Sequence, residues 1–329
     1  MEIAGVTVAK ATKRRHAIEL VELADGTRVS LPALFVNGAT TGPRLYLGAA
    51  IHGDEVNGVA ILGRVLSELD PSRLAGSIVA VLVQNPLALH ADHRLALSHY
   101  LKSPLDQAPA DPWTCFPGNA DGSLAERIAH ILFGLIRTCD AAIDLHTPTR
   151  GGRYVPISIL PPPALGEASQ RAEALAVAFG SGYVVKTDKG MYVRDGILCV
   201  EATRAGVPAF TFEIGEGGRL EPEMVDIGAR CVRNALRHLT MMDGKPEPPA
   251  HTVRVREFIG VRAYRGGLLT THVELGAPVR RGDVLARITS VYGEEIEAIR
   301  CPADGIFIRS TTLSTVAAGE RVVTVGIPE

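Results

Sequence analysis

The chain has 329 residues, of which 46% are hydrophobic, and 34 basic and 36 acidic side chains give it a formal net charge of −2. This length can bury a large core and favours two domains, while the balanced charge gives no reason to expect nucleic acid or an anionic membrane as a partner. The sequence has neither a secretory signal nor an apolar run of membrane-spanning length, so we expect a soluble, cytoplasmic protein. Its five cysteines are scattered singly without a C-x-x-C pair, which disfavours a disulfide framework and a thiolate zinc site.

The first part of the chain contains strand patterns and one clear helix pattern. Residues 1–36 alternate apolar and polar side chains on either side of an Asp25-Gly26 turn, which predicts an antiparallel hairpin. Residues 44–69, RLYLGAAIHGDEVNGVAILGRVLSEL, predict a buried strand, a tight turn and an amphipathic helix. The apolar run SIVAVLVQ is typical of a strand covered on both faces. Residues 86–118 are proline-rich and lack periodicity, which predicts a functional loop.

Strands and helices then alternate as far as residue 242. Ser123 and Glu126 form a capping box for a helix that ends near Arg137. The elements predicted after it are strands at AAIDLHT, 154–160, YVVKT and PAFTFEI and helices at 165–179 and 221–242. This alternation predicts an α/β fold whose mixed, mostly parallel sheet carries helices on both faces.

A change of pattern marks a second domain. Residues 244–250, within DGKPEPPA, are predicted to be a linker between a first domain at 1–243 and a small all-β barrel or sandwich at 251–329. The segments GAPVRRGDVLARI and CPADGIFIR are similar to biotinyl and lipoyl carriers, but no lysine follows Lys245, which excludes covalent attachment of either group. We expect this domain to cover the first one or to support a homo-oligomer.

Three predicted strands end in residues of the types that bind metals. His52 and Glu55 follow the first strand, His146 ends the second, and Glu213 ends the third. In open α/β sheets such ends, beside a switch in strand order, form the ligand-binding crevice. Two imidazoles and one carboxylate are a ligand set used by catalytic zinc, with a fourth position left for water. We therefore expect one zinc ion per chain, bound by His52, Glu55 and His146.

The neighbouring residues suggest roles in hydrolysis. Zinc-bound water has a pKa of about 7, and Glu213 would be the general base that accepts its proton. Asp144 is expected to orient the imidazole of His146, and Arg94 to stabilise a developing oxyanion. Each of these residues also has a structural interpretation that involves no metal. The H-x-x-E turn can cap a helix, and a histidine at a strand end can form a structural hydrogen bond. Glu213 can lie on a solvated turn, and Arg94 can be a surface cation.

A second group of candidate metal ligands lies in the proline-rich segment. It consists of His90, Asp92 and His93, with His99 nearby. The irregular setting favours a solvated loop over a metal site.

At these residues the sequence resembles the succinylglutamate desuccinylase and aspartoacylase family, a branch of the zinc carboxypeptidase superfamily. The matching segments occur in the family's order and are GAAIHGDEVNG, VQNPLALHADHR, FPGNADGSLAERIA, IDLHT and FTFEIGEGG. The resemblance implies a zinc carboxypeptidase-like fold and a deacylase that hydrolyses the amide bond of a small N-acyl compound. The residue roles that it implies are zinc ligands at His52, Glu55 and His146, a catalytic base at Glu213, and a cation that polarises the scissile carbonyl at Arg94.

One departure from the family's pattern concerns the substrate. Many members read Asp-Leu-Asn-Arg before Phe-Pro-Gly, and that Asn-Arg pair holds the substrate's carboxylate. Trp113 and Thr114 stand in its place here, and bidentate recognition by arginine is hard to replace. N-acetylaspartate and succinylglutamate are therefore poor candidates. We expect a less anionic substrate beside Trp113, or one whose carboxylate meets Arg150, Arg153 or Arg219.

Two alternatives to a small-molecule deacylase are a zinc carboxypeptidase acting on peptides and a non-catalytic metal-binding scaffold. The missing Asn-Arg pair disfavours the carboxypeptidase, because recognition of a terminal carboxylate would be its main need. The presence of all three expected ligands together with the expected base disfavours the scaffold.

Overall fold

The computed structural model describes residues 1–96 and 109–329. Its strands are β1 (Glu2–Ile3), β2 (Val6–Thr7), β3 (Thr12–Glu22), β4 (Arg28–Asn37), β5 (Thr40–Ala49), β6 (Ala75–Val81), β7 (Ala141–His146), β8 (Gly152–Ile159), β9 (Tyr183–Val185), β10 (Ala209–Glu216), β11 (Val253–Arg262), β12 (Gly267–Thr271), β13 (Pro278–Val279), β14 (Val284–Thr289), β15 (Glu295–Arg300), β16 (Gly305–Thr311), β17 (Thr315–Val316) and β18 (Arg321–Pro328). Its helices are α1 (Asn57–Glu68), α2 (Pro86–His90), α4 (Leu124–Ile136), α5 (Glu167–Phe179), α6 (Leu198–Arg204) and α7 (Pro222–His238), and its 3-10 turns are η1 (Pro71–Arg73), η2 (Pro112–Thr114), η3 (Pro163–Leu165) and η4 (Met191–Val193).

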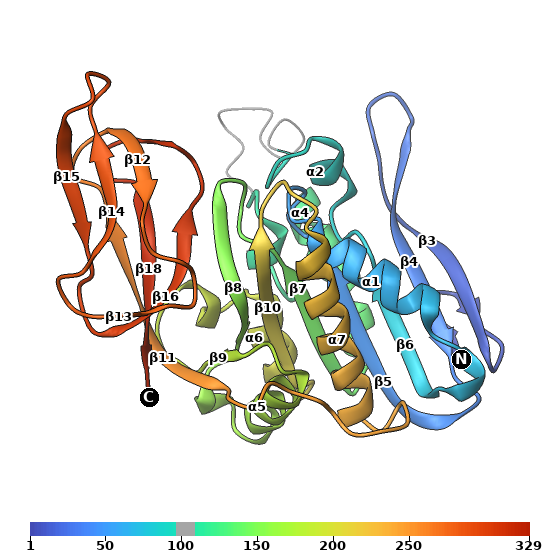
Figure 1. The fold of residues 1–329 in the computed structure, drawn as a ribbon. Coiled ribbons are helices and arrows are strands. Elements are labelled where there is room, and N and C mark those ends of the chain that lie inside the picture. Colours follow the sequence, from blue (N-terminus) through green and yellow to red (C-terminus); the bar gives the residue numbers. More distant parts are fainter. Residues whose placement is uncertain (97–108) are drawn as a thin grey trace.

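One sheet of 12 strands crosses the molecule in the order β13-β16-β18-β11-β9-β8-β10-β7-β5-β6-β4-β3 (Figure 1). Parallel pairs join β6, β5, β7 and β10 at its centre and β8, β9 and β11 beside them. The remaining pairs are antiparallel. The fold is therefore mixed α/β, as predicted. The expected predominance of parallel pairs is not confirmed, because antiparallel strands from both ends of the chain extend the sheet.

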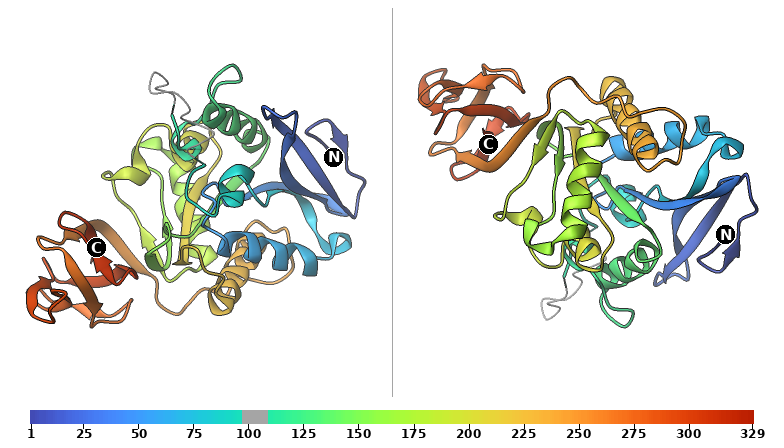
Figure 2. Two further views of the ribbon diagram at one scale, coloured as in Figure 1. Left: turned by 90° about the horizontal axis from the view of Figure 1, so that it is seen from above. Right: turned by 90° about the horizontal axis from the view of Figure 1, so that it is seen from below.

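Two groups of helices pack against the central strands (Figure 2), and each group shares a hydrophobic cluster with strand residues. Alternate residues of a strand face opposite sides of a sheet, and on β5 Leu45 and Leu47 face one hydrophobic cluster while Tyr46 faces the other. The first cluster contains buried residues of α1, α5 and α7, and the second contains buried residues of α4 and α6. At the contact of α1 with α7, a Cβ on Gly228 would lie 2.2 Å from Ile61 Cδ1, so a larger residue there would force the buried Ile61 side chain to move.

Two short helices were not predicted. Helix α6 is buried at almost every position, so its sequence lacks the polar face that reveals an amphipathic helix. Helix α2 lies in the segment that was expected to be irregular, and it begins at Pro86 after Asn85, whose side chain accepts a hydrogen bond from the Ala88 N–H. None of the helices in the described ranges is long and apolar enough to cross a membrane.

The region after residue 250 is rich in strands, as predicted, and has a hydrophobic cluster of its own. Strands β15, β14, β12 and β17 form a separate sheet. The rest of the region continues the large sheet, because β11 pairs with β9 and β16 pairs with β8. Backbone hydrogen bonds therefore connect the two predicted domains directly.

Candidate active site

The predicted site residues lie where the central parallel strands end. Strands β5, β7 and β10 run in the same direction, and Glu213 on β10 lies opposite His146 on β7 in the register. Asp144 lies opposite Gly48 on β5, shortly before the turn that carries His52 and Glu55. The carboxyl ends of the three strands thus bring residues from distant parts of the sequence to one edge of the sheet.

The turn after β5 is packed tightly against α2. A Cβ on Gly53 would lie 1.9 Å from the carbonyl carbon of Ala88, so only glycine fits at this position. The Asn85 side chain donates a hydrogen bond to the Ile51 carbonyl oxygen at 3.1 Å, and the Gly53 N–H donates to the Arg94 carbonyl oxygen at 3.3 Å. These contacts place Arg94 next to the histidine turn.

His52, Glu55 and His146 form a compact and buried group. The Nδ1 atoms of His52 and His146 each lie 2.8 Å from one of the two Glu55 carboxylate oxygens. One ligand atom from each residue lies within 4.8 Å of the others, and each side chain is at most 2% exposed. Two imidazole nitrogens and a carboxylate suit zinc. The donor types and their spacing therefore fit a single divalent cation.

The outer nitrogen of each imidazole lies next to a second carboxylate. His146 Nε2 is 2.7 Å from Asp144 Oδ2, and His52 Nε2 is 3.1 Å from Asp111 Oδ1. Metal-binding histidines are commonly oriented in this way. Asp144 was predicted to lie behind His146. Asp111 was not predicted for His52, although it begins the Asp-Pro-Trp-Thr segment in which the departure from the family was noted.

Opposite charges compensate one another within this group. Burial opposes ionisation of Glu55, but the two imidazoles outweigh burial and lower its pKa. Burial likewise opposes protonation of both histidines, but Glu55 raises the pKa of His52, and Asp144 and Glu55 raise that of His146. Protons must leave the two Nδ1 atoms before these can bind a cation, so metal affinity should increase with pH.

Replacing Asp111 with Asn is expected to weaken metal binding by about 10- to 100-fold, because the variant loses the charged acceptor that orients His52. The same carboxylate has its pKa lowered to about 2, since His52 and Arg94 together outweigh its burial. Metal affinity measured by competition with a chelator checks this prediction. Asp195→Asn is a control, since Asp195 is exposed and pairs with Arg204. An unchanged affinity in the Asp111 variant would contradict the expected role.

Glu213 is buried, with 4% of its surface exposed, and it has one side-chain partner. The Tyr192 hydroxyl donates to its Oε1 at 2.7 Å, while Oε2 has no partner among the described residues. Burial first, and then the charge of Glu55, raise the pKa of Glu213. A carboxylate with a raised pKa is suited to accept a proton. Tyr192 was not predicted, because it lies in the short η4 turn and no spacing pattern connects it with Glu213.

Arg94 lies at the edge of the group with its guanidinium held by three side chains. Its donors lie 3.0 Å from Asp111 Oδ2, 3.0 Å from Thr149 Oγ1 and 3.5 Å from Glu55 Oε1. The side chain is 25% exposed. Arg94 thus contacts Glu55 of the histidine cluster and is also partly exposed to solvent.

Trp113 forms an apolar wall beside both histidines. Its ring centroid is 5.9 Å from that of His52, 5.5 Å from that of His146 and 5.5 Å from that of Tyr192. It is 2% exposed, and its Nε1 has no partner among the described residues. Thr114 beside it is exposed. An indole therefore stands next to the histidines where the family's pattern has an amide and a guanidinium.

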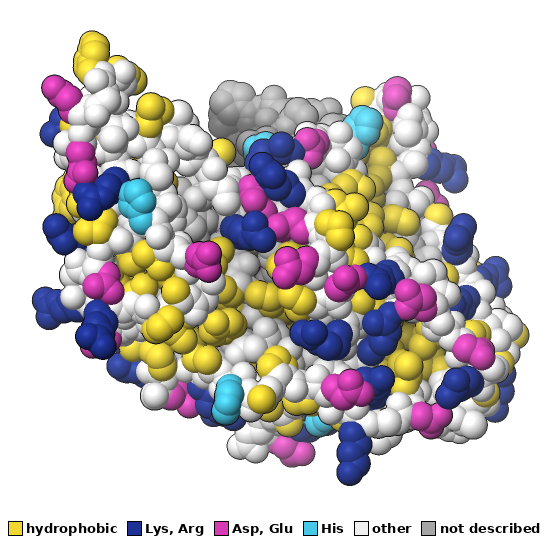
Figure 3. All heavy atoms as spheres, in the orientation of Figure 1, with side chains coloured by type: hydrophobic (Ala, Val, Ile, Leu, Met, Phe, Trp, Pro, Cys, Tyr) yellow, Lys and Arg dark blue, Asp and Glu magenta, His cyan; other side chains and the backbone are white. Residues whose placement is uncertain are grey.

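The three arginines proposed to meet a substrate carboxylate are each paired with an acidic residue of the protein. These pairs are Arg150 with Asp92 at 2.5 Å, Arg153 with Glu221 at 2.8 Å and Arg219 with Glu216 at 3.2 Å. Acidic and basic side chains accordingly lie side by side over the upper ends of β8 and β10 in Figure 3. Each of these guanidiniums already faces a carboxylate of the protein, which weakens its attraction for a free carboxylate.

The second predicted ligand group does not form a cluster among the described residues. His90, Asp92 and His93 are exposed, and Asp92 pairs with Arg150. His99 lies outside the described residues. Within residues 1–96 and 109–329, the group around Glu55 is the only cluster of His, Cys, Asp or Glu side chains whose spacing suits a metal ion.

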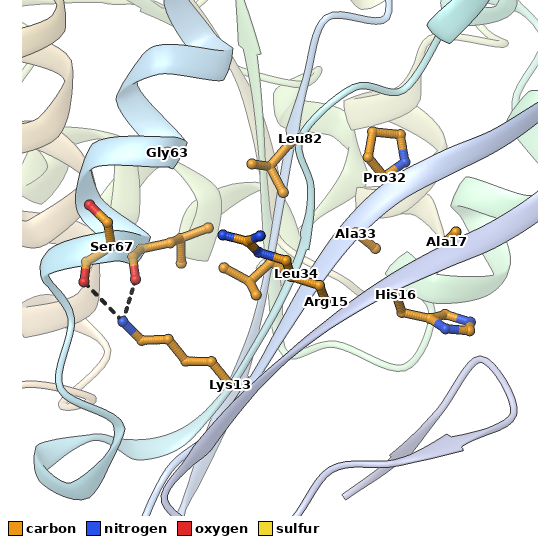
Figure 4. A pocket seen from close by; sticks show the side chains of 11 residues that line it. Lys13, Arg15, His16, Ala17, Pro32, Ala33, Leu34, Gly63, Ser67 and Leu82 are labelled. Atoms are coloured by element: carbon orange, nitrogen blue, oxygen red, sulfur yellow. Dashed lines mark hydrogen bonds between the residues drawn. The ribbon is translucent and has the colours of Figure 1, made fainter.

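The structure also has a large groove of about 760 Å³ between the β3–β4 hairpin and α1 (Figure 4). Lys13 crosses one side of it and donates to the carbonyl oxygens of Leu66 and Ser67 at the end of α1. The residues that line this groove include none of the predicted site residues. It is therefore separate from the histidine cluster.

Comparisons with known proteins identify the family of this chain. Residues 41–239 match the model of the succinylglutamate desuccinylase/aspartoacylase catalytic domain. The N-alpha-acetyl-L-2,4-diaminobutyric acid deacetylase of Halomonas elongata is 29% identical over 298 residues, which cover 86% of this chain and 82% of that protein.

Solved structures share the fold over nearly the whole chain. A succinylglutamate desuccinylase/aspartoacylase from Rhodobacter sphaeroides has a TM-score of 0.82 and 26% identity, covering 98% of this chain and 99% of its own. The product-bound ectoine utilization protein EutE (DoeB) from Ruegeria pomeroyi has a TM-score of 0.81 and 24% identity, covering 98% of both chains. As the sequence analysis predicted, the chain belongs to the succinylglutamate desuccinylase/aspartoacylase family of amide hydrolases.

Proposed function

We propose that this protein is a zinc-dependent N-deacylase that hydrolyses the amide bond of a small N-acyl compound that is less anionic at the end next to Trp113. The observation that carries the proposal is the buried His52, Glu55 and His146 cluster with the free Glu213 oxygen beside it. The family of this chain and its relationship to a deacetylase support the reaction class.

His52, Glu55 and His146 would hold the zinc ion, and Asp111 and Asp144 would orient the two imidazoles. A bound zinc ion polarises the acyl carbonyl as a Lewis acid and lowers the pKa of an attacking water. The buried setting of these residues excludes bulk water, which strengthens each electrostatic contact with the substrate. Residues 1–243 would form the catalytic unit, 244–250 the linker and 251–329 the C-terminal β domain.

The proton of the attacking water passes to Glu213, whose Oε2 has no other described partner. Glu213 then gives this proton to the nitrogen of the leaving amine, so the acid and the base of the reaction are one residue. Arg94 donates hydrogen bonds to the carbonyl oxygen as it becomes negative. Asp111 and Thr149 keep the Arg94 guanidinium at the edge of the site for this purpose.

The surroundings of the site support a substrate with little negative charge. Trp113 provides an apolar wall, and the nearby arginines are paired with protein carboxylates. The related Halomonas enzyme is named for N-alpha-acetyl-L-2,4-diaminobutyric acid, which carries a free amine as well as a carboxylate. A peptide carboxypeptidase would need an unpaired cation for the terminal carboxylate, and none of these three arginines offers one.

We expect the kcat/KM for Nα-acetyl-2,4-diaminobutyrate to exceed that for N-acetylaspartate by about 10- to 100-fold, since the second carboxylate of N-acetylaspartate would be desolvated without a cationic partner. Steady-state assays of amine release with the two compounds check this expectation. In a Thr114→Arg variant, which restores one donor of the family's pair, the ratio should move toward N-acetylaspartate. Faster hydrolysis of N-acetylaspartate by the unchanged protein would contradict the proposed specificity.

A further inference from the structure

The position of the proposed base depends on a single side-chain hydrogen bond. Tyr192 donates to Glu213 Oε1 at 2.7 Å, and no described residue contacts Oε2 closely enough to bond it. The Tyr192 bond is therefore the contact that fixes which carboxylate oxygen is left free for proton transfer. Burial, followed by the charge of Glu213, raises the pKa of Tyr192 well above its ordinary value, so its hydroxyl remains a donor at neutral pH.

Tyr192 is not itself held by a long element. It belongs to the η4 turn of three residues, so the packing of its ring must define its position. Trp113 meets the ring edge to face, with centroids 5.5 Å apart and planes at 71°. Tyr192 also packs against the hydrophobic cluster that contains Tyr154.

Tyr154 connects this pair to the C-terminal region. In the register of β8 it lies opposite Gly215 on β10 and opposite Arg309 on β16. The guanidinium carbon of Arg309 lies 5.8 Å from the centre of the Tyr154 ring, in a cation–π contact. Both tyrosines also line a cavity of about 280 Å³, and the C-terminal residues in its wall include Phe258, Arg321 and Thr324.

We propose that Tyr192 positions Glu213 for proton transfer, and that the C-terminal β region holds Tyr192 in place through the contact of Arg309 with Tyr154. This inference rests on the proposed hydrolase function and extends it. Tyr192 is a positioning residue, because it acts on the reaction through Glu213. Residues 251–329 thereby take part in catalysis while contributing no residue to the histidine cluster.

The test compares two conservative variants in the full chain. Tyr192→Phe keeps the packed ring but removes one hydrogen bond to a charged group, so kcat should decrease about 10- to 100-fold. The KM and the metal content should stay at the wild-type values, because neither the substrate nor the ligand group loses a contact. Arg309→Met keeps the aliphatic stem and removes the charge above Tyr154, and we expect kcat to decrease about threefold.

Matched controls separate these effects from general damage. Tyr183→Phe changes a half-buried tyrosine on β9, and Arg287→Met changes a C-terminal arginine that pairs with Glu295; both should keep the wild-type kcat. A wild-type kcat in Tyr192→Phe, or a decrease that comes with a raised KM, would overturn the positioning role. A wild-type kcat in Arg309→Met would overturn the part given to the C-terminal region.

Measuring Glu213→Gln in the same series distinguishes failure of this inference from failure of the proposed function. If Glu213→Gln retains full turnover, the proposed base is wrong. If Glu213→Gln is inactive and Tyr192→Phe is fully active, only the positioning role is wrong.

Discussion

Replacing Glu213 with Gln is expected to lower kcat by about 10²- to 10⁴-fold, which is the usual contribution of a general acid–base residue. Glutamine has nearly the same shape, and its amide can still meet the Tyr192 hydroxyl, but it cannot accept the proton of the attacking water. Metal content should be unchanged, because the cluster of His52, Glu55 and His146 does not include Glu213. Steady-state kinetics together with elemental analysis of the same preparation measure both quantities.

Glu216→Gln is the matched control for this variant. Glu216 lies three residues further along β10, is also buried, and pairs with Arg219 at 3.2 Å. It should retain most of the wild-type turnover. If Glu216→Gln and Glu213→Gln lost activity equally, the loss would reflect disturbance of the strand end. That result would contradict the assignment of Glu213 as the general base.

His146→Ala is expected to abolish stable metal binding and with it all measurable hydrolysis. A catalytic zinc site with three protein ligands is left with two, and the buried Asp144 carboxylate loses its imidazole partner at 2.7 Å. We expect about one zinc ion per chain in the wild-type protein purified without added metal, and none in the variant. Wild-type protein stripped with a chelator should lose activity and recover it when zinc is restored.

Two further samples make the metal experiment decisive. His272→Ala removes an exposed histidine of the C-terminal region and should keep the metal. His146→Gln keeps a polar side chain of similar reach, and its thermal unfolding shows whether the loss of metal is separate from loss of the fold. The absence of transition metal from the wild-type protein, with none taken up on addition, would remove the basis for hydrolysis and favour a non-catalytic scaffold.

Local sequence patterns were sufficient for the elements that frame the site. The strand, turn and helix of residues 44–69 were predicted because an apolar run, a glycine-containing turn and a helical period follow one another without interruption. The ends of β7 and β10 were predicted in the same way, and parallel strands bring such ends to one edge of the sheet. Membership of the family followed from short segments in a fixed order, and the match over residues 41–239 confirmed it.

Local sequence patterns did not predict which strands join the large sheet at its edges. The composition of residues 244–250 predicted a linker before a β domain, and no pattern indicated that β11 and β16 of that domain pair with β9 and β8 and continue the large sheet. Sequence periodicity reports which face of a strand is buried and carries no information about which strand lies beside it. The pairing of edges between distant segments is set by the packing of the complete molecule.

Side-chain partners at the site likewise depended on the tertiary structure. The sequence by itself predicted that His52, His146 and Glu213 would lie at strand ends, because each directly follows a mostly apolar run, and that Glu55 would lie in the turn three residues after His52. Only the folded chain brings Asp111 behind His52, Tyr192 onto Glu213, and acidic residues onto the three arginines. Apart from the neighbouring pair Arg219–Glu216, these contacts join segments that are far apart in the sequence and share no periodic pattern. Their formation depends on distances of 2.5 to 3.2 Å between side chains, which a linear spacing of residues does not specify.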